Sequence, residues 1–170
     1  RQGMGLLSEN RKEEGLLLNR DLADNLTLTH FGPFTRAGLI ARGKQLDAAQ
    51  HWVEKLQVKT QGPTQHVGER SGGNQQKIAI AKWLATNPRL LILDSPTVGV
   101  DIGAREGIFK IVRDLAHRGL SIMLISDEVS EVYFNCNRVL HMSGGTILKE
   151  YIPARCDISE MESAVYGSGI

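Results

Sequence analysis

Apolar residues along this chain alternate between short continuous runs and longer stretches with helical spacing. The short runs, which are typical of buried strands, are Met4–Leu7, Leu90–Leu93, Leu120–Ile125 and Arg138–Met142. Gly144-Gly145 follows the last run and predicts a tight turn before another strand. Short apolar runs separated by helical patterns predict an α/β domain built on a mostly parallel sheet.

Helices are expected between these runs, because apolar residues recur there at helical intervals. The predicted helices are a short one over 21–28, a long one over 36–56, one after Ser71-Gly72-Gly73, one over 104–116 and a short one after Ser126. Asp21 is a typical first-turn cap, while Asn87-Pro88 and Gly119 end two of the helices. The helical patterns over 21–28 and 36–56 therefore predict a helical subdomain.

Composition narrows the class of protein. The chain has 170 residues, Lys and Arg total 20 against 19 Asp and Glu, and the net charge is +1, so no basic field for nucleic acid exists. No apolar run approaches the roughly 18 to 20 residues that span a bilayer, so we expect any membrane role to be peripheral.

The two cysteines lie far apart, which favours a reducing compartment and argues against a disulfide framework or a zinc site. The start at Arg1 lacks an initiator Met and a signal peptide and looks like a cut.

A glycine pair that opens a helix is the first candidate for chemistry. Ser71-Gly72-Gly73-Asn74-Gln75 would let a ligand approach the backbone closely, and the N–H groups of a first helical turn bind phosphate. The alternative is a plain capped helix start, with Ser71 or Asn74 as the cap.

A carboxylate at a strand end is the second candidate. Asp94 follows the apolar run Leu90–Leu93, where open parallel sheets bind ligands and where a carboxylate can hold Mg²⁺. The alternative is an Asp that only forms a turn. The two candidates lie 23 residues apart (71 to 94), joined by one helix, and Ser126-Asp127-Glu128 follows the next predicted strand.

With these motifs in order, the chain resembles the ATP-binding subunits of ABC transporters. The segment Ser71–Gln75 is similar to the family signature, Leu90–Asp94 to Walker B, and Val98–Asp101 to the D-loop. The run Ser71–Leu84, with Glu9–Gly15 upstream, is similar to the second nucleotide-binding domain of bacterial sugar-import ATPases of the ribose and galactoside type. The likeness extends from Gly3 to about Lys149.

The resemblance implies a P-loop NTPase fold of the ABC type with a helical subdomain, incomplete at the N-terminus. It implies ATP and Mg²⁺ as cofactors, and as partners a second ABC nucleotide-binding domain, a transmembrane permease and, indirectly, a periplasmic solute-binding protein, with no nucleic acid. The location implied is the cytoplasmic face of the bacterial inner membrane. The implied parts are the end of the first core segment with the Q-loop region (1–18), the helical subdomain and signature helix (19–88), the Walker B core (89–152) and a C-terminal tail or helix (153–170).

Several positions depart from the family pattern. Ser95 stands where the family has the catalytic Glu beside Asp94, and a hydroxyl is no carboxylate base. Asp127 stands at the switch histidine, where an anion would repel phosphate. Glu9 replaces the glutamine of the Q-loop, and Arg70 precedes Ser71 where Leu is usual.

A phosphate loop of the form GxxxxGK[ST] is the remaining family motif. Gly38–Gln45 fits its first seven positions, but Gln45 lacks the hydroxyl for Mg²⁺, no predicted strand precedes it, and it follows Glu9 instead of preceding it. We therefore interpret it as a basic helical surface.

The resemblance thus implies an asymmetric ATPase: this chain supplies its signature to a partner's ATP, while its own Walker B site is degenerate. On its own the chain is expected to be inactive. An alternative is a non-catalytic, nucleotide-responsive ABC module, and a third, a soluble ABC protein of repair or translation, fits the signature less well. The implied nucleotide-binding residues are Glu9, Ser71, Gly72, Gly73, Asn74, Gln75 and Asp101, and the implied catalytic residues are Asp94, Ser95 and Asp127, with Asp94 as the metal ligand.

Overall fold

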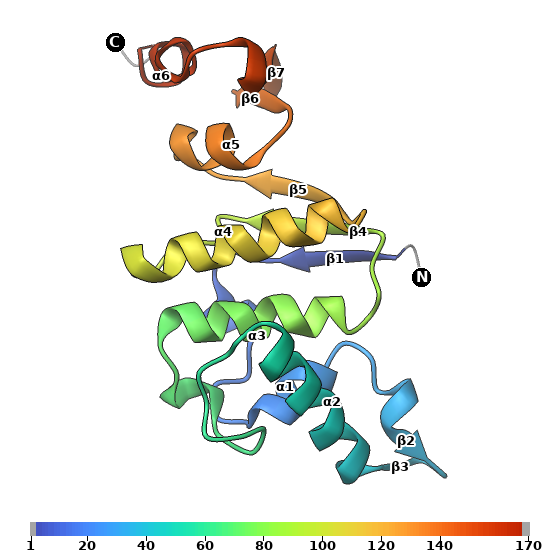
Figure 1. Cartoon of the computed structure of the whole chain (residues 1–170). Helices are drawn as coiled ribbons and strands as arrows, with labels where there is room; N and C mark the ends of the chain where they lie inside the picture. The colour runs from blue at the N-terminus through green and yellow to red at the C-terminus, as the bar shows by residue number, and fades with distance from the viewer. Residues whose placement is uncertain (1–2, 168–170) are drawn as a thin grey trace. The chain divides into compact units, whose positions relative to one another are not determined.

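The chain divides into two compact units, Arg1–Met123 and Leu124–Ile170. The structure is a computed structural model that describes residues 3–167 (Figure 1). Each unit is described by itself. The boundaries predicted at 18, 88 and 152 stay predictions. No helix within the described residues has the length and apolar character needed to cross a bilayer.

A parallel sheet organises the first unit. Strand β1 (Met4–Leu7) runs parallel to β4 (Leu90–Asp94), in a register that pairs Met4 with Leu90 and Leu7 with Leu93. The strand order is β1-β4-β5, with β5 at Ser121–Ile125. The α/β class with parallel pairing, predicted from the apolar runs, is confirmed.

The burial predicted for β5 was wrong. Its unbroken apolar run predicted a strand covered on both faces, yet Met123 is 52% and Ile125 42% exposed. Alternate side chains of a strand point to opposite faces. Here Ile122 and Leu124 are half-buried while the other face is open, and a run that is apolar on both sides does not reveal this.

Helix α3 (Gly72–Leu84) is the centre of the first unit and lies between β1 and the helices α1 (Leu22–Thr27) and α2 (Arg42–Lys55) (Figure 1). It also contacts α4 (Ile102–His117). Of the apolar side chains whose spacing predicted this helix, Ile78, Ala81 and Leu84 are buried and Ala85 is half-buried. At its N-terminus α3 therefore comes close to the segment that leads from β4 into α4.

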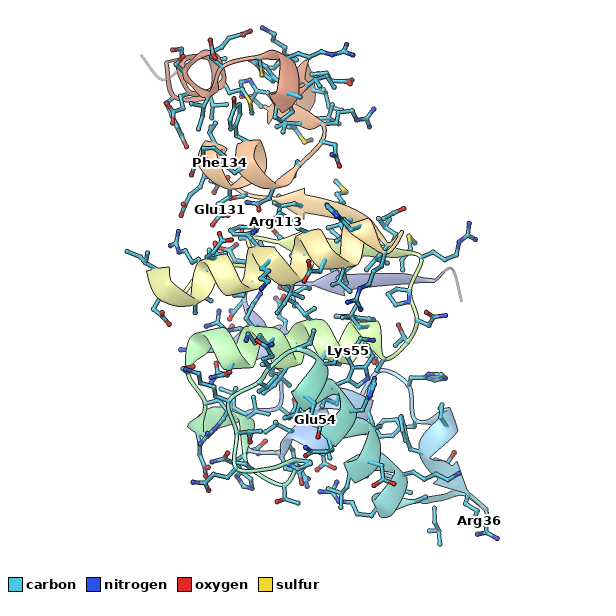
Figure 2. All side chains as sticks on the ribbon, in the orientation of Figure 1. Arg36, Glu54, Lys55, Arg113, Glu131 and Phe134 are labelled. Atoms are coloured by element: carbon cyan, nitrogen blue, oxygen red, sulfur yellow. The ribbon has the colours of Figure 1, made fainter. Side chains whose placement is uncertain are left out.

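The helix predicted over 36–56 begins later than expected, at Arg42. Residues 35–40 instead form a hairpin of β2 (Thr35–Arg36) and β3 (Leu39–Ile40). The turn residues Ala37 and Gly38 have φ of 51° and 78°, the combination that suits a two-residue hairpin and that glycine adopts without strain. Arg36 extends from the hairpin into solvent (Figure 2), and Leu39 and Ile40, which had matched the helical spacing, are exposed.

The second unit contains α5 (Val129–Asn135), the antiparallel strands β6 (Val139–Ser143) and β7 (Thr146–Tyr151), and α6 (Ile158–Tyr166). Its small core is formed by Val129, Val139, Tyr151 and Met161. The turn predicted at Gly144-Gly145 joins β6 to β7.

Candidate functional site

The carboxyl ends of β1 and β4 bring three sequence-predicted residues to one edge of the sheet. Because Leu7 pairs with Leu93 in parallel register, the loop at Ser8-Glu9 and the turn at Asp94-Ser95 leave the sheet side by side. Asp94 is half-buried, and Glu9 is exposed. The edge therefore carries carboxylates where open parallel sheets bind their ligands.

Ser95 has an unusual backbone conformation. Its φ of 44° lies in the left-handed region, which non-glycine residues rarely adopt. The carbonyl of Ser95 accepts the Val98 N–H at 3.1 Å, and Pro96 and Thr97 are buried behind the turn. The hydroxyl that replaces the expected Glu lies 3.5 Å from Asp94 Oδ1. The turn thus presents a hydroxyl beside Asp94 and supplies no second carboxylate there.

The N-terminus of α3 settles which residue caps the helix. Ser71 occupies the N-cap position, with φ of −61° and ψ of 155°, but its side chain makes no capping bond to the backbone. Its Oγ instead accepts a hydrogen bond from Asn74 Nδ2 at 2.9 Å, while Asn74 Oδ1 accepts the Lys59 N–H at 2.8 Å. An N-terminus without a side-chain cap is suited to an anion, because first-turn N–H groups and the helix dipole both favour negative charge.

Both glycines of the signature-like segment are packed against the chain that follows β4. A Cβ placed on Gly72 would lie 2.5 Å from the Gly99 carbonyl oxygen, and one on Gly73 would lie 2.6 Å from Ala104 Cβ. Contacts this short are not tolerated without a backbone shift. The segment Ser71–Gln75 and the D-loop-like segment Val98–Asp101, which the sequence placed in family order, are therefore in direct contact.

Gln75, an expected nucleotide contact, faces the interior. Its Nε2 donates to the carbonyls of Val67 at 3.3 Å and Arg70 at 3.1 Å. The side chain is 5% exposed and holds the loop that leads into α3. A role for Gln75 at the nucleotide stays a prediction.

Arg11 is the residue that sequence reasoning missed. Its Nη1 donates to the Val98 carbonyl at 2.5 Å and its Nη2 to the Gly99 carbonyl at 2.9 Å, and the residue is only 4% exposed. Burial lowers the pKa of its guanidinium. Because Arg11 lies in the charged run after Glu9, its sequence context indicates a solvated loop. The likeness of Glu9–Gly15 to the sugar-import relatives was the one available signal.

Lys82 is a second buried cation of the same region. Its Nζ donates to the Gly15 carbonyl and lies 5.4 Å from the centre of the Trp83 ring. Desolvation lowers the pKa of this ammonium group. Ser8 Oγ, just after β1, donates to the Glu14 carboxylate. The Lys82 bond joins the loop after β1 to helix α3, and the Ser8 bond joins two residues within that loop.

Asp101 caps α4: its Oδ1 accepts the Ala104 N–H at 3.0 Å. Asp101→Ala should lower the free energy of unfolding by about 1 kcal/mol, because one first-turn N–H loses its partner. Urea unfolding at neutral pH measures this. Asp101→Asn keeps an acceptor oxygen and should lose much less, so an equal loss in both variants would show that charge, not capping, stabilises the helix.

Asp127 belongs to the second unit and is exposed. The loop that carries it is held by Tyr166, whose hydroxyl donates to the Asp127 carbonyl at 3.2 Å and accepts the Val129 N–H at 3.1 Å. Ser126 Oγ donates to Glu131 Oε2 at 2.7 Å. The backbone at Asp127 is therefore fixed, while its carboxylate faces solvent.

Asp94 is the residue of this site that fits a metal ion, and the ion that it fits is Mg²⁺. Among residues 3–167 no group of three or more His, Cys, Asp or Glu side chains is arranged around a common point. Mg²⁺ in nucleotide sites is held by one or two carboxylates together with phosphate oxygens and water, so a single Asp94 fits that mode. Gly38 lies in the β2–β3 turn and Leu39–Ile40 form strand β3 of that antiparallel hairpin, so Gly38–Gln45 is not a continuous loop between a strand of a parallel sheet and a helix.

Comparison with solved structures shows which known fold this chain has. A dimeric, post-hydrolysis state of the ATP-binding cassette MJ0796 bound to ADP and Pi matches with a TM-score of 0.72 and 20% identity over 89% of this chain and 63% of that one. A second dimeric structure of MJ0796, a bacterial ABC transporter cassette, matches with a TM-score of 0.70 and 20% identity over 88% and 62%. The chain therefore has the fold of an ATP-binding cassette.

Sequence comparisons agree with the fold. The ribose import ATP-binding protein RbsA of Rhodococcus jostii is 39% identical over 99% of this chain, and that of Halalkalibacterium halodurans is 40% identical over 99%. The chain spans 33% of the length of each. The ABC transporter family model matches residues 1–98. Fold, motif order and family model agree, and the chain belongs to the ABC transporter family.

Proposed function

We propose that this chain is part of the ATP-binding subunit of an importer for a sugar or polyol. Relatives that match nearly the whole chain are named ribose import ATP-binding proteins, which supports this substrate class. In the proposed arrangement the chain supplies Ser71, Gly72 and Gly73 to an ATP molecule held by a second nucleotide-binding domain. Its own site, at Asp94 and Ser95, hydrolyses ATP weakly or has a structural role.

The N-terminus of α3 is the observation that carries this proposal. Ser71 stands at its exposed tip without a capping bond, and the glycine pair behind it is braced by Gly99 and Ala104. Backbone N–H groups in a rigid, preorganised turn stabilise phosphate charge without reorganisation. Asn74 and Gln75 support this turn from behind through their bonds to Lys59, Val67 and Arg70.

The weak site is proposed from the residues at the sheet edge. Asp94 would hold Mg²⁺, which when bound neutralises phosphate charge. Ser95 supplies no carboxylate to accept a proton from water, and Asp127 would place a negative charge where the family has a neutral or cationic imidazole. Glu9 and Asp101 would complete the nucleotide surroundings. The missing carboxylate base beside Asp94 favours slow hydrolysis at that site.

The proposed partners are a second nucleotide-binding domain, a transmembrane permease and a periplasmic solute-binding protein, with the chain at the cytoplasmic face of the membrane. The MJ0796 cassettes of the same fold are dimeric, which supports pairing of cassettes. ATP and Mg²⁺ are the proposed cofactors.

Substitution of Ser71 tests the proposed role of the signature. In the full-length protein, Ser71→Arg should lower ATP turnover at least tenfold, because a long side chain at the exposed helix tip would block the partner's nucleotide. Ser71 lies at the surface, so the thermal midpoint should not fall. Ser71→Ala, the matched control, should lose only a few-fold. Full turnover in Ser71→Arg would contradict the proposal.

Ser95 and Asp127 also support a second candidate, a nucleotide-responsive module that binds ATP without hydrolysing it. The same protein separates the two: stable ATP binding with no phosphate release from either site would favour the module, and phosphate release abolished by Ser71→Arg would favour the ATPase.

A further inference from the structure

We infer that Arg11 is a positioning residue that fixes the D-loop-like segment against the N-terminus of α3. The effect on ATP turnover rests on the function proposed above, whereas the effect on the backbone does not. No contact of Arg11 with nucleotide is required.

The contacts of the guanidinium carry the inference. Its two terminal nitrogens bond to consecutive carbonyls, those of Val98 and Gly99, which are 87 and 88 residues away in the sequence. The Gly99 carbonyl is also the atom that a Cβ on Gly72 would meet, and Arg11 Nη2 would lie 2.8 Å from that same Cβ. Arg11, Gly72 and Gly99 therefore meet at one point, and the guanidinium decides how closely the two backbones approach.

Bonding to two neighbouring carbonyls requires the planar guanidinium group of arginine, and a positive charge alone does not provide it. Val98 of the D-loop-like segment is 47% exposed, and Gly99 has a φ of 67°. An arginine presents parallel N–H groups at fixed spacing, which match two neighbouring carbonyls. A lysine offers a point charge on a flexible chain and holds one carbonyl at a time.

The helix that carries Arg11 is itself anchored at both ends. Arg11–Gly15 is one turn of π-helix, a form that is rare and often found at functional positions. Its first residue holds Val98 and Gly99, and its last residue, Gly15, accepts the bond from Lys82 of α3. The turn therefore links the loop at Glu9 to both segments of the proposed signature surface.

Burying the Arg11 guanidinium against the Val98 and Gly99 carbonyls has an energetic cost. A buried cation without a carboxylate is costly. Within residues 3–167 the acceptors of Arg11 are backbone carbonyls, and its Nε is buried without a hydrogen-bond partner. A purely structural role would be met at lower cost by an apolar side chain of similar volume. An apolar side chain cannot bond to the Val98 and Gly99 carbonyls and so does not fix their positions.

Hydrogen exchange of the full-length protein tests the backbone half of the inference. In Arg11→Met, amides of residues 97–100 should exchange at least tenfold faster, because the turn bonds from Val98 to Ser95 and from Val100 to Thr97 lose their brace. Helix α3 should keep its protection. Lys12→Met, which removes an adjacent exposed cation, is the matched control and should change neither segment.

Arg11→Lys separates charge from geometry and covers the case in which Arg11→Met does not fold. It keeps the charge but should still exchange several-fold faster at 97–100. Exchange that is unchanged there in Arg11→Lys and Arg11→Met, or that rises equally in α3, would overturn the positioning role.

ATP turnover tests whether the position of the D-loop-like segment affects hydrolysis. Per folded protein, kcat should fall about tenfold in Arg11→Met with KM for ATP changed less than threefold, because the surface is misplaced for the reaction while the partner still binds ATP. Faster exchange with unchanged kcat would overturn this half alone. If Ser71→Arg also left kcat unchanged, the proposed function would fail while the positioning of the backbone stood.

Discussion

Gly72→Ala is expected to lower the free energy of unfolding by about 2 to 4 kcal/mol and to reduce ATP turnover of the full-length protein at least tenfold. The added methyl group would lie 2.5 Å from the Gly99 carbonyl oxygen and 2.8 Å from Arg11 Nη2. The carbonyl belongs to the backbone and has no rotamer to change, so the D-loop-like segment must move away from α3. That movement would also break the bond between Gly99 and Arg11.

Chemical unfolding gives the stability, and phosphate release under saturating ATP gives the turnover. Gly107→Ala is the matched control, since Gly107 lies in α4 with nothing within 4 Å of its added Cβ. It should stabilise the protein by up to about 1 kcal/mol, the ordinary gain for alanine over glycine in a helix. Equal stability of Gly72→Ala and Gly107→Ala would show that the close approach at Gly72 does not exist in solution.

Ser95→Glu is expected to raise hydrolysis at the site that contains Asp94 by about 100-fold, within the range that a positioned general base supplies. The new carboxylate would stand next to Asp94 at the carboxyl edge of the sheet, where Ser95 now offers only a hydroxyl. The left-handed φ of 44° opposes any side chain with a Cβ, but serine already meets that cost of about 1 kcal/mol, so glutamate adds little.

Single-turnover hydrolysis by the full-length protein measures this site without interference from product release. Ser95→Gln has nearly the same shape without the charge and should remain as slow as the parent. If both variants leave the rate unchanged, Ser95 is not the defect, and the exposed Asp127 becomes the residue to change.

Local sequence patterns predicted most of the helices and strands, because the spacing of apolar residues within one segment indicates its secondary structure. Four apolar residues before Asp94 predicted β4, and buried residues at helical spacing predicted α3. The family order of motifs predicted which segments carry the nucleotide-binding residues, and that role stays a prediction. The contact between Gly72 and Gly99 was not predicted, because no pattern within either segment encodes its distance from the other.

The errors have physical causes as well. Leu39 and Ile40 matched the spacing of α2, but periodicity does not reveal that Ala37 and Gly38 both adopt positive φ and reverse the chain. Arg11 was overlooked because it lies among polar and charged neighbours and its acceptors are main-chain oxygens, which every residue has. Patterns within the chain also did not reveal that the Gln75 amide bonds to the Val67 and Arg70 carbonyls, and its role at the nucleotide stays a prediction.

The pairing of β1 with β4 has a consequence for how this protein is made. Met4 and its partner Leu90 are 86 residues apart in the chain (4 to 90), and everything between them folds without adding a strand to this sheet. Contacts that close such long loops form late and slow the folding of a domain. On a ribosome, the helices α1, α2 and α3 would emerge and pack before β4 is available to pair with β1. The sheet edge at Glu9 and Asp94 would therefore assemble only after β4 emerges, and nascent chains interrupted before residue 94 would carry helix α3 without that edge beside it.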